Sequence, residues 1–206
     1  HELLEARLHR PVRLALRQPL EAGKIEVIRA GFTASYPARF QLVLAMNPCP
    51  CGNYGVRGSE CVCPSLAIRR YSTRLSGPLR DRIDIELQVA RVAAIHAMSG
   101  DRTTFTSATA RGRVLEARDR AASRWRGTPW RRNGEIPGAR LRQLDVRIGS
   151  DARSPLDRAL ERGALTLRGY DRVLRVAWTL ADLAGVDRPG ADEVGGALFL
   201  KRGVVS

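Results

Sequence analysis

The stretch Met46-Asn47-Pro48-Cys49-Pro50-Cys51-Gly52 carries the most information about this chain. It continues through Cys61-Val62-Cys63 to the segment Arg74-Leu75-Ser76-Gly77-Pro78-Leu79-Arg80-Asp81-Arg82-Ile83-Asp84. One apolar run, over residues 42–46, precedes it and another, over 83–89, follows its arginine-rich end. This order predicts a buried strand, a polar strand end, a cysteine loop, a helix and a second buried strand.

All four cysteines of the protein lie in this stretch, as two C-x-C pairs: Cys49 and Cys51, then Cys61 and Cys63. Two close pairs of thiolates can supply the four ligands of a tetrahedral structural zinc. Paired cysteines in a sequence without a secretory signal favour a metal site over disulfides. We therefore predict zinc, and four reduced thiols in a loop are the alternative.

The chain of 206 residues carries a formal net charge of +14. Such a surplus is typical of proteins that bind nucleic acid, an acidic partner or a membrane surface. Only Lys24 and Lys201 are lysines, and so strong a bias to arginine also arises from genome composition alone. No stretch approaches the ~18 apolar residues that span a bilayer, so we expect a cytoplasmic protein without a membrane partner.

The hydrophobic pattern predicts further elements along the chain. Turn and capping residues set several of their ends, among them Ala30-Gly31 and Thr166. The predicted elements are a helix within 4–22, strands over 25–28, 32–34, 39–46 and 83–90, a helix over 65–75, a basic helix over 107–126 with Val114, Ala117, Ala121 and Trp125 on its buried side, helices beginning at Ser154-Pro155 and after Thr166, and a helix over 190–201.

Two polar residues stand at the ends of the buried strands. Asn47 follows the first, at the sheet edge where α/β proteins bind ligands, and its amide could orient a water toward a phosphate. Asn-Pro is also a common turn opener. Arg82 precedes the second strand, and its planar guanidinium suits phosphate oxygens. An ion pair with Asp81 or Asp84 is the alternative.

Other arginines occupy unusual or crowded positions. Arg168 falls in the first turn of the helix capped by Thr166, where a cation opposes the helix dipole at a cost of roughly 0.3–1 kcal/mol. An anion docked at that helix end would reverse the cost, and solvent screening is the alternative. The arginines of the 107–126 helix either form a solvated face or bind a phosphate backbone, with Trp125 and Trp130 available for stacking.

Together these motifs resemble the magnesium-chelatase-like AAA+ ATPases of bacteria, and within them the competence-associated branch linked with DNA branch migration. The resemblance implies an α/β fold: a partial AAA+ core, built as a parallel sheet with flanking helices, followed by a helical lid domain. It places the core with its cysteine loop at 1–92, a connector with the basic helix at 93–130 and the lid at 131–206. The residues that carry it are Ala15-Leu16-Arg17-Gln18-Pro19-Leu20-Glu21, Ile28-Arg29-Ala30-Gly31, Tyr36-Pro37-Ala38, residues 45–52, residues 74–84, Asn133-Gly134-Glu135-Ile136-Pro137-Gly138, residues 168–177 and residues 180–185.

The resemblance also implies roles for individual residues. Asn47 matches the sensor-1 asparagine that positions the attacking water, Arg82 the arginine finger, and Arg168 the sensor-2 arginine of the lid. Arg29 falls in the hairpin that related helicases point into their DNA pore, and Lys24, directly before its first strand, is the second predicted DNA-binding residue. The implied cofactors are ATP and Mg²⁺, and the implied partners are DNA and the neighbouring subunits of a homo-hexameric ring.

The sequence departs from the family at the nucleotide site. The phosphate-binding loop G-x-x-x-x-G-K-[ST] is absent from these residues. The resemblance implies that Glu2 is the remnant of the acidic pair that holds magnesium. We therefore expect a fragment or truncated product that does not hydrolyse ATP alone. A non-catalytic, zinc-bearing DNA-binding remnant and the inert product of a broken gene are the alternatives.

Overall fold

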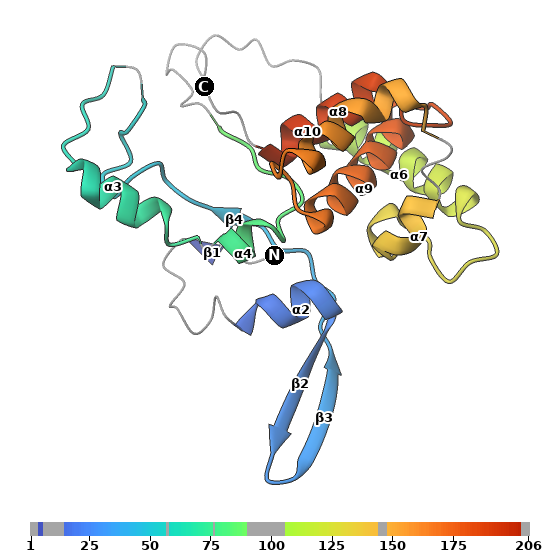
Figure 1. Cartoon of the computed structure of the whole chain (residues 1–206), viewed down its shortest axis with the longest axis horizontal. Helices are drawn as coiled ribbons and strands as arrows, with labels where there is room; N and C mark the ends of the chain where they lie inside the picture. Colours follow the sequence, from blue (N-terminus) through green and yellow to red (C-terminus); the bar gives the residue numbers. More distant parts are fainter. Residues whose placement is uncertain are drawn as a thin grey trace. The chain divides into compact units, whose positions relative to one another are not determined.

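The computed structural model describes residues 4–5, 15–56, 58–75, 77–89, 106–143 and 148–202. The chain forms two compact units, His1–Arg82 and Ile83–Ser206, and each is described by itself. The fold combines helices with small two-stranded sheets (Figure 1). None of the described helices is both long and apolar enough to cross a lipid bilayer.

The N-terminal unit contains a short parallel strand pair, in which Leu4 lies opposite Leu44 and Glu5 opposite Ala45. The helix predicted within 4–22 is therefore wrong at Leu4 and Glu5 and is confirmed over Arg17–Ala22, and residues 6–14 lie outside the described residues. Gly23 ends that helix with a φ of 66°, as its position predicts. The elements are β1 (Leu4–Glu5), α2 (Arg17–Ala22), β2 (Lys24–Arg29), β3 (Phe32–Pro37), β4 (Leu44–Ala45), α3 (Ser65–Ser72) and α4 (Gly77–Arg80).

The two predicted buried strands are not present as predicted. Over 39–46 only Leu44–Ala45 forms a strand, and Val43 is 46% exposed. Residues 83–89 form no strand, and Val89 is 88% exposed. A buried strand needs hydrogen-bonded neighbours on both edges. Here β4 pairs over two residues with β1, and the N–H of Glu86 donates to the carbonyl of Leu200 instead.

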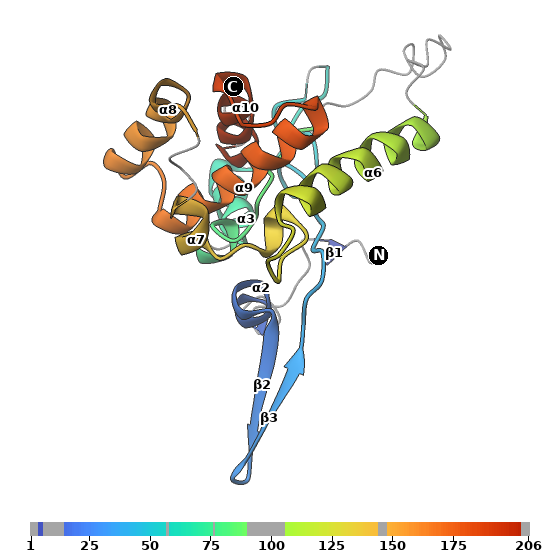
Figure 2. The same cartoon turned by 90° about the vertical axis from the view of Figure 1, so that its right-hand side faces the viewer.

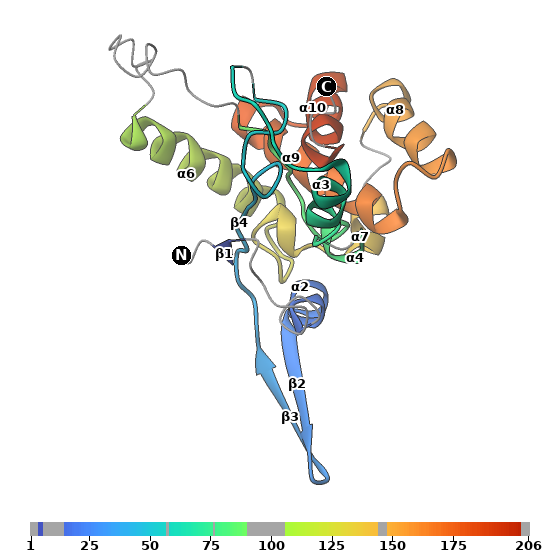
Figure 3. The same cartoon turned by 90° about the vertical axis from the view of Figure 1, so that its left-hand side faces the viewer.

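The β2–β3 hairpin is confirmed, including its turn at Ala30-Gly31. These two residues have φ of 46° and 82°, the pair of positive values that a tight hairpin turn requires. The strands are antiparallel, with Arg29 opposite Phe32 next to the turn. Figures 1, 2 and 3 show a long ribbon that starts beside α2, and no other described element of the N-terminal unit lies beside its tip.

The C-terminal unit holds one apolar core around α9, whose N-cap Thr166 accepts a hydrogen bond from the Gly169 N–H at 3.0 Å. Gly196 lets α10 approach α9, because a Cβ there would lie 3.3 Å from Leu180 Cδ1. The elements are α6 (Ser107–Arg124), η1 (Asn133–Glu135), α7 (Gly138–Gln143), α8 (Ser150–Glu161), α9 (Leu167–Ala184) and α10 (Ala191–Arg202), and the core includes Ile136, Leu141, Leu156, Tyr170, Val173, Leu174, Ala177, Trp178, Val194 and Ala197.

A buried polar network centred on Asp182 joins α6 to α9. Arg124 donates to both carboxylate oxygens, at 3.0 and 2.5 Å, and Asn133 donates to Oδ2 at 2.8 Å. Arg120 donates to the main-chain carbonyl of Asp182 at 2.7 Å. The Arg124 guanidinium also lies 4.5 Å from the ring centroid of Trp178. The charge of Asp182, which is 1% exposed, is therefore fully compensated.

Two expectations for this unit are wrong. Trp125 does not offer its ring for stacking, because it is 5% exposed and its indole N–H donates to Asn133 Oδ1 at 3.0 Å. The helix predicted to begin at Ser154-Pro155 begins at Ser150 instead and contains Pro155. Packing overrides the proline, since Leu156 is fully buried just after it.

We expect Asp182→Ala to destabilise the C-terminal unit strongly. It leaves the Arg124 guanidinium, 14% exposed, without its carboxylate. Removing one partner of a buried ion pair costs about 3–5 kcal/mol in free energy of unfolding, measurable by urea titration. The exposed Asp187 is the matched control, and Asp187→Ala should change stability by less than about 0.5 kcal/mol. Equal effects of the two substitutions would contradict this.

Candidate metal centre and functional residues

The sulfur atoms of Cys49, Cys51, Cys61 and Cys63 converge, and all lie within 4.8 Å of one another. Cys49 Sγ is 3.3 Å from Cys51 Sγ and 3.7 Å from Cys61 Sγ. The sulfurs of Cys51 and Cys61 are 3.7 Å apart. Cys49 is fully buried, and the other three are exposed or half-buried. The loop therefore brings together all the cysteines that the sequence separates into two pairs.

This donor set fits one tetrahedral metal ion. Four sulfurs at ~2.3 Å from a zinc ion would lie ~3.8 Å from one another. The separations among Cys49, Cys51 and Cys61, 3.3 to 3.7 Å, are close to that value. The four residues offer thiolates alone, which favours a soft or borderline metal. The four cysteines together could therefore bind a metal, as the sequence predicts.

The thiols of the cluster differ in acidity. Burial raises the pKa of Cys49, but hydrogen bonds from the main-chain N–H of Tyr54 and from the Cys51 and Cys61 thiols outweigh it and lower that pKa to about 6. A hydrogen bond with the main chain of Cys51 lowers the pKa of Cys63. Side-chain hydrogen bonds with Cys51 and Cys49, burial and the charge of Cys49 outweigh it and raise that pKa to about 12. The first thiolate therefore forms at the buried position, and it makes the next deprotonation harder.

Asn47 lies two residues beyond β4, at the mouth of the cysteine loop. Its side chain is exposed and faces Gly52, where a Cβ would lie 3.9 Å from Nδ2. Gly52 has a φ of 81°, which lets the loop turn back toward the strand end. Asn47 therefore follows an apolar strand, as predicted, although that strand is only Leu44–Ala45.

Arg82 is held inside the N-terminal unit. Its guanidinium forms an ion pair with Glu21 on α2 and donates to the Pro78 carbonyl at 2.7 Å, and the side chain is 10% exposed. Its Nε has no hydrogen-bond partner among the described residues. The alternative of an ion pair with Asp81 or Asp84 is therefore wrong, because the carboxylate partner is Glu21.

The other predicted residues are distributed along the chain. Arg168 is exposed in the first turn of α9, as predicted. Arg29 lies beside the hairpin turn, and Lys24, at the base of β2, forms an ion pair with Glu26 at 2.5 Å. Glu2 lies outside the described residues.

Several contacts at these sites were missed by the sequence analysis. Glu21 is 61 positions from Arg82, so no local pattern links them. Arg172, 9% exposed, donates to Asp84 at 2.5 Å, a pairing over 88 positions. The local sequence Arg70-Tyr71 with Arg74, by contrast, indicates a basic and aromatic surface at the C-terminal end of α3.

Comparison with known families gives matches over nearly the whole chain. Residues 2–97 match the family described as magnesium chelatase, subunit ChlI, and residues 104–201 match the family of its C-terminal part. The chain therefore belongs to the magnesium-chelatase-like family.

Individual relatives agree with this assignment. An uncharacterized protein of Mycobacterium tuberculosis is 48% identical over 190 residues, which are 91% of this chain and 36% of that protein. Competence protein ComM of Haemophilus influenzae is 38% identical over 172 residues, 83% of this chain and 32% of that protein. The protein YifB of Salmonella typhimurium is 36% identical over 178 residues, which are 84% of this chain and 33% of that protein. The chain thus spans about a third of the length of these relatives.

We expect the purified, reduced chain to bind about one zinc ion, measured by elemental analysis. Cys49→Ser should lose most of the metal, because it removes the buried donor that contacts two other sulfurs. Val62→Ser introduces the same residue between Cys61 and Cys63 without removing a sulfur, so it should retain the metal. A metal-free wild type, or equal metal in both variants, would exclude the site.

Proposed function

We propose that this chain is part of an AAA+ ATPase whose parent protein couples ATP hydrolysis to the remodelling of DNA within a ring of subunits. Membership of the magnesium-chelatase-like family supports the nucleotide part. The DNA part rests on one observation above all, the β2–β3 hairpin with Arg29 beside its exposed tip in a chain of net charge +14. The relative named as a competence protein adds support.

In this proposal residues 1–92 form the C-terminal part of the AAA+ core, 93–130 a connector and 131–206 the helical lid. The parallel pairing of β1 with β4 is what a remnant of a parallel core sheet would retain. The helices packed around α9 would then form the lid, with Arg168 in the first turn of its central helix.

The proposed chemistry assigns each residue a position at the nucleotide. Asn47 would orient the attacking water, Glu2 would act with Mg²⁺, and Arg168 would contact the nucleotide's phosphates from the lid. Arg82 would reach the ATP of a neighbouring subunit. To do so its guanidinium must exchange the Glu21 carboxylate, which it contacts through Nη2, for phosphate oxygens, which can accept two parallel hydrogen bonds from an arginine.

The metal, in the same proposal, is a structural zinc held by the four cysteines. Closed sites of four thiolates leave no open position for chemistry. A zinc ion there would fix the loop that follows Asn47, since Cys49 is only two residues away.

Arg29→Ala is expected to weaken DNA binding by the chain in a salt-dependent manner. Loss of one phosphate contact lowers the slope of log affinity against log salt by about 1. Fluorescence anisotropy with a labelled duplex measures this slope. Arg188 is exposed and has no ion pair with a described residue, so Arg188→Ala is the control of equal charge. Identical slopes for both variants, or binding that ignores salt, would count against the hairpin contact.

Arg82 should be able to complete the site of a neighbouring subunit, although the chain alone should not hydrolyse ATP. A finger supplied in trans is worth ~10³–10⁵ in rate in nucleotide hydrolases. The chain is mixed with a full-length relative that lacks its own finger, and phosphate release is followed. Partial rescue by wild type and by Arg80→Ala, but not by Arg82→Ala, is expected. Rescue by all three, or robust hydrolysis by the chain alone, would reject the assignment.

A further inference from the structure

A pocket of about 360 Å³ lies between α3 and the cysteine loop. This volume falls within the roughly 300–1,000 Å³ of ligand sites. Pro50, between Cys49 and Cys51, forms one wall, and Pro64, directly after Cys63, forms another. The geometry of the cysteine cluster therefore sets the separation of the two prolines.

The α3 side of the pocket is positively charged. Arg70 and Arg74 line it, both exposed, and neither forms an ion pair with any residue that the structure describes. The helix itself contains no acidic residue to offset them. The C-terminal end of a helix favours cations, which accounts for Arg70 but not for the convergence of both arginines on one pocket.

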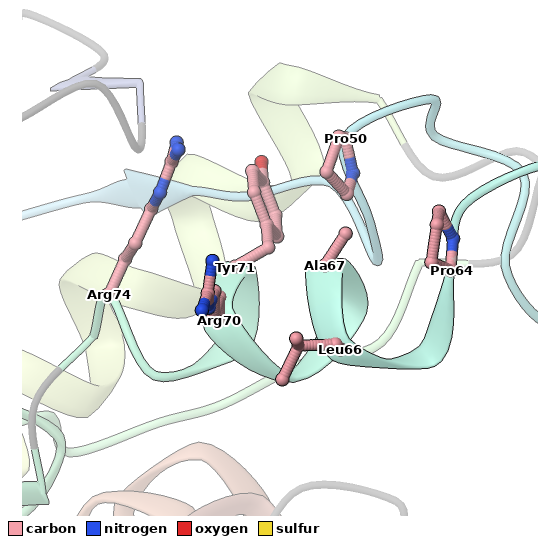
Figure 4. A pocket seen from close by; sticks show the side chains of 7 residues that line it. All are labelled: Pro50, Pro64, Leu66, Ala67, Arg70, Tyr71 and Arg74. Atoms are coloured by element: carbon pink, nitrogen blue, oxygen red, sulfur yellow. The ribbon is translucent and has the colours of Figure 1, made fainter.

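An aromatic ring lies between these charges and the prolines. The Arg74 guanidinium is 5.1 Å from the ring centroid of Tyr71. In Figure 4 the Tyr71 ring lies between Arg74 and Pro50, and Ala67 projects to the same side of α3 as the ring. The half-buried Tyr71 ring and the Pro50 ring offer apolar surfaces, and the arginines beside them offer hydrogen-bond donors for an anion.

We propose that this pocket binds one nucleotide unit of single-stranded DNA, with its base stacked on Tyr71 and the flanking phosphates on Arg70 and Arg74. Stacking on an aromatic ring combined with a basic track is how proteins bind single strands without sequence preference. A duplex does not fit this chemistry, because its bases are already stacked on one another. The proposal rests on the DNA-directed function proposed above and adds a site distinct from the hairpin.

The base contact is tested with the full 206-residue chain and labelled oligothymidylate, using fluorescence anisotropy at low salt. Tyr71→Ala should weaken binding about 5- to 150-fold, the range for loss of one base–aromatic stack. Tyr71→Phe retains the ring and should bind like wild type. Tyr54, an exposed tyrosine of the cysteine loop, is the matched control, and Tyr54→Ala should also bind like wild type. Equal binding by Tyr71→Ala and Tyr54→Ala would overturn the proposal.

The wild-type chain alone gives a second test that no folding defect can obscure. An abasic oligomer of equal length keeps the phosphates and lacks the bases, so it should bind more weakly than oligothymidylate. Thymidine monophosphate should bind much more weakly than both, because it carries only one of the two phosphates that flank the base in a strand. Equal affinity for the abasic oligomer, or tight binding of the mononucleotide, would refute the proposed occupant.

The arginines are tested by the salt dependence of single-strand binding. Arg70→Ala and Arg74→Ala should each lower the slope by about 0.7, the value for one phosphate contact on a single strand. Arg69→Ala, on the same helix but outside the pocket lining, should not. Equal slopes for all three variants would reduce the site to diffuse charge and overturn the inference. The proposed DNA function would still stand if Arg29→Ala weakened duplex binding, whereas absence of any DNA binding by wild type would defeat both.

Discussion

The convergence of four cysteine sulfurs is the constraint on which the N-terminal unit depends. Among its described residues, Cys49 and Leu79 are the buried apolar side chains besides Pro19, so burial of hydrophobic surface supplies little stability there. The hairpin, exposed along both strands, cannot compensate, because an isolated pair of strands is marginally stable. Where a core is this small, a metal commonly takes its place.

The C-terminal unit is stabilised in another way. Its helices share one apolar core, and the Asp182 network fixes the position of α6 on α9. Hydrogen bonds from Arg120, Arg124 and Asn133 leave no charge of that network uncompensated. The two units should therefore respond differently to removal of a bound metal ion. A chelator would destabilise the cysteine loop and leave the helical core folded.

Elements with strong local signals were predictable from the sequence. The Ala30-Gly31 turn depends on a glycine that tolerates positive φ, and the Thr166 cap on a hydroxyl that accepts a hydrogen bond from an N–H three residues later. Both depend only on residues close in sequence, and both are confirmed. The strands over 39–46 and 83–90 were not, because a strand depends on partners elsewhere in the chain that a local pattern does not reveal.

The same limit applies to the candidate sites. The four cysteines were predictable as one cluster because all of them lie within residues 49–63 and because closely paired cysteines commonly bind a metal. The Glu21 partner of Arg82 was not, since α2 and the arginine-rich segment meet only in the folded chain. The burial of Trp125, by contrast, follows from the local pattern, which places it on the buried side of the basic helix. That burial excludes the stacking of its ring on bases.

Zinc K-edge X-ray absorption of the zinc-loaded chain tests the central claim most directly, because it measures the ligand atoms themselves. If the cysteine cluster organises the loop, the spectrum should show four sulfur neighbours at ~2.3 Å and no nitrogen or oxygen ligand. A site with fewer sulfurs, completed by nitrogen or oxygen ligands, would contradict the claim that the two C-x-C pairs meet at a single metal ion.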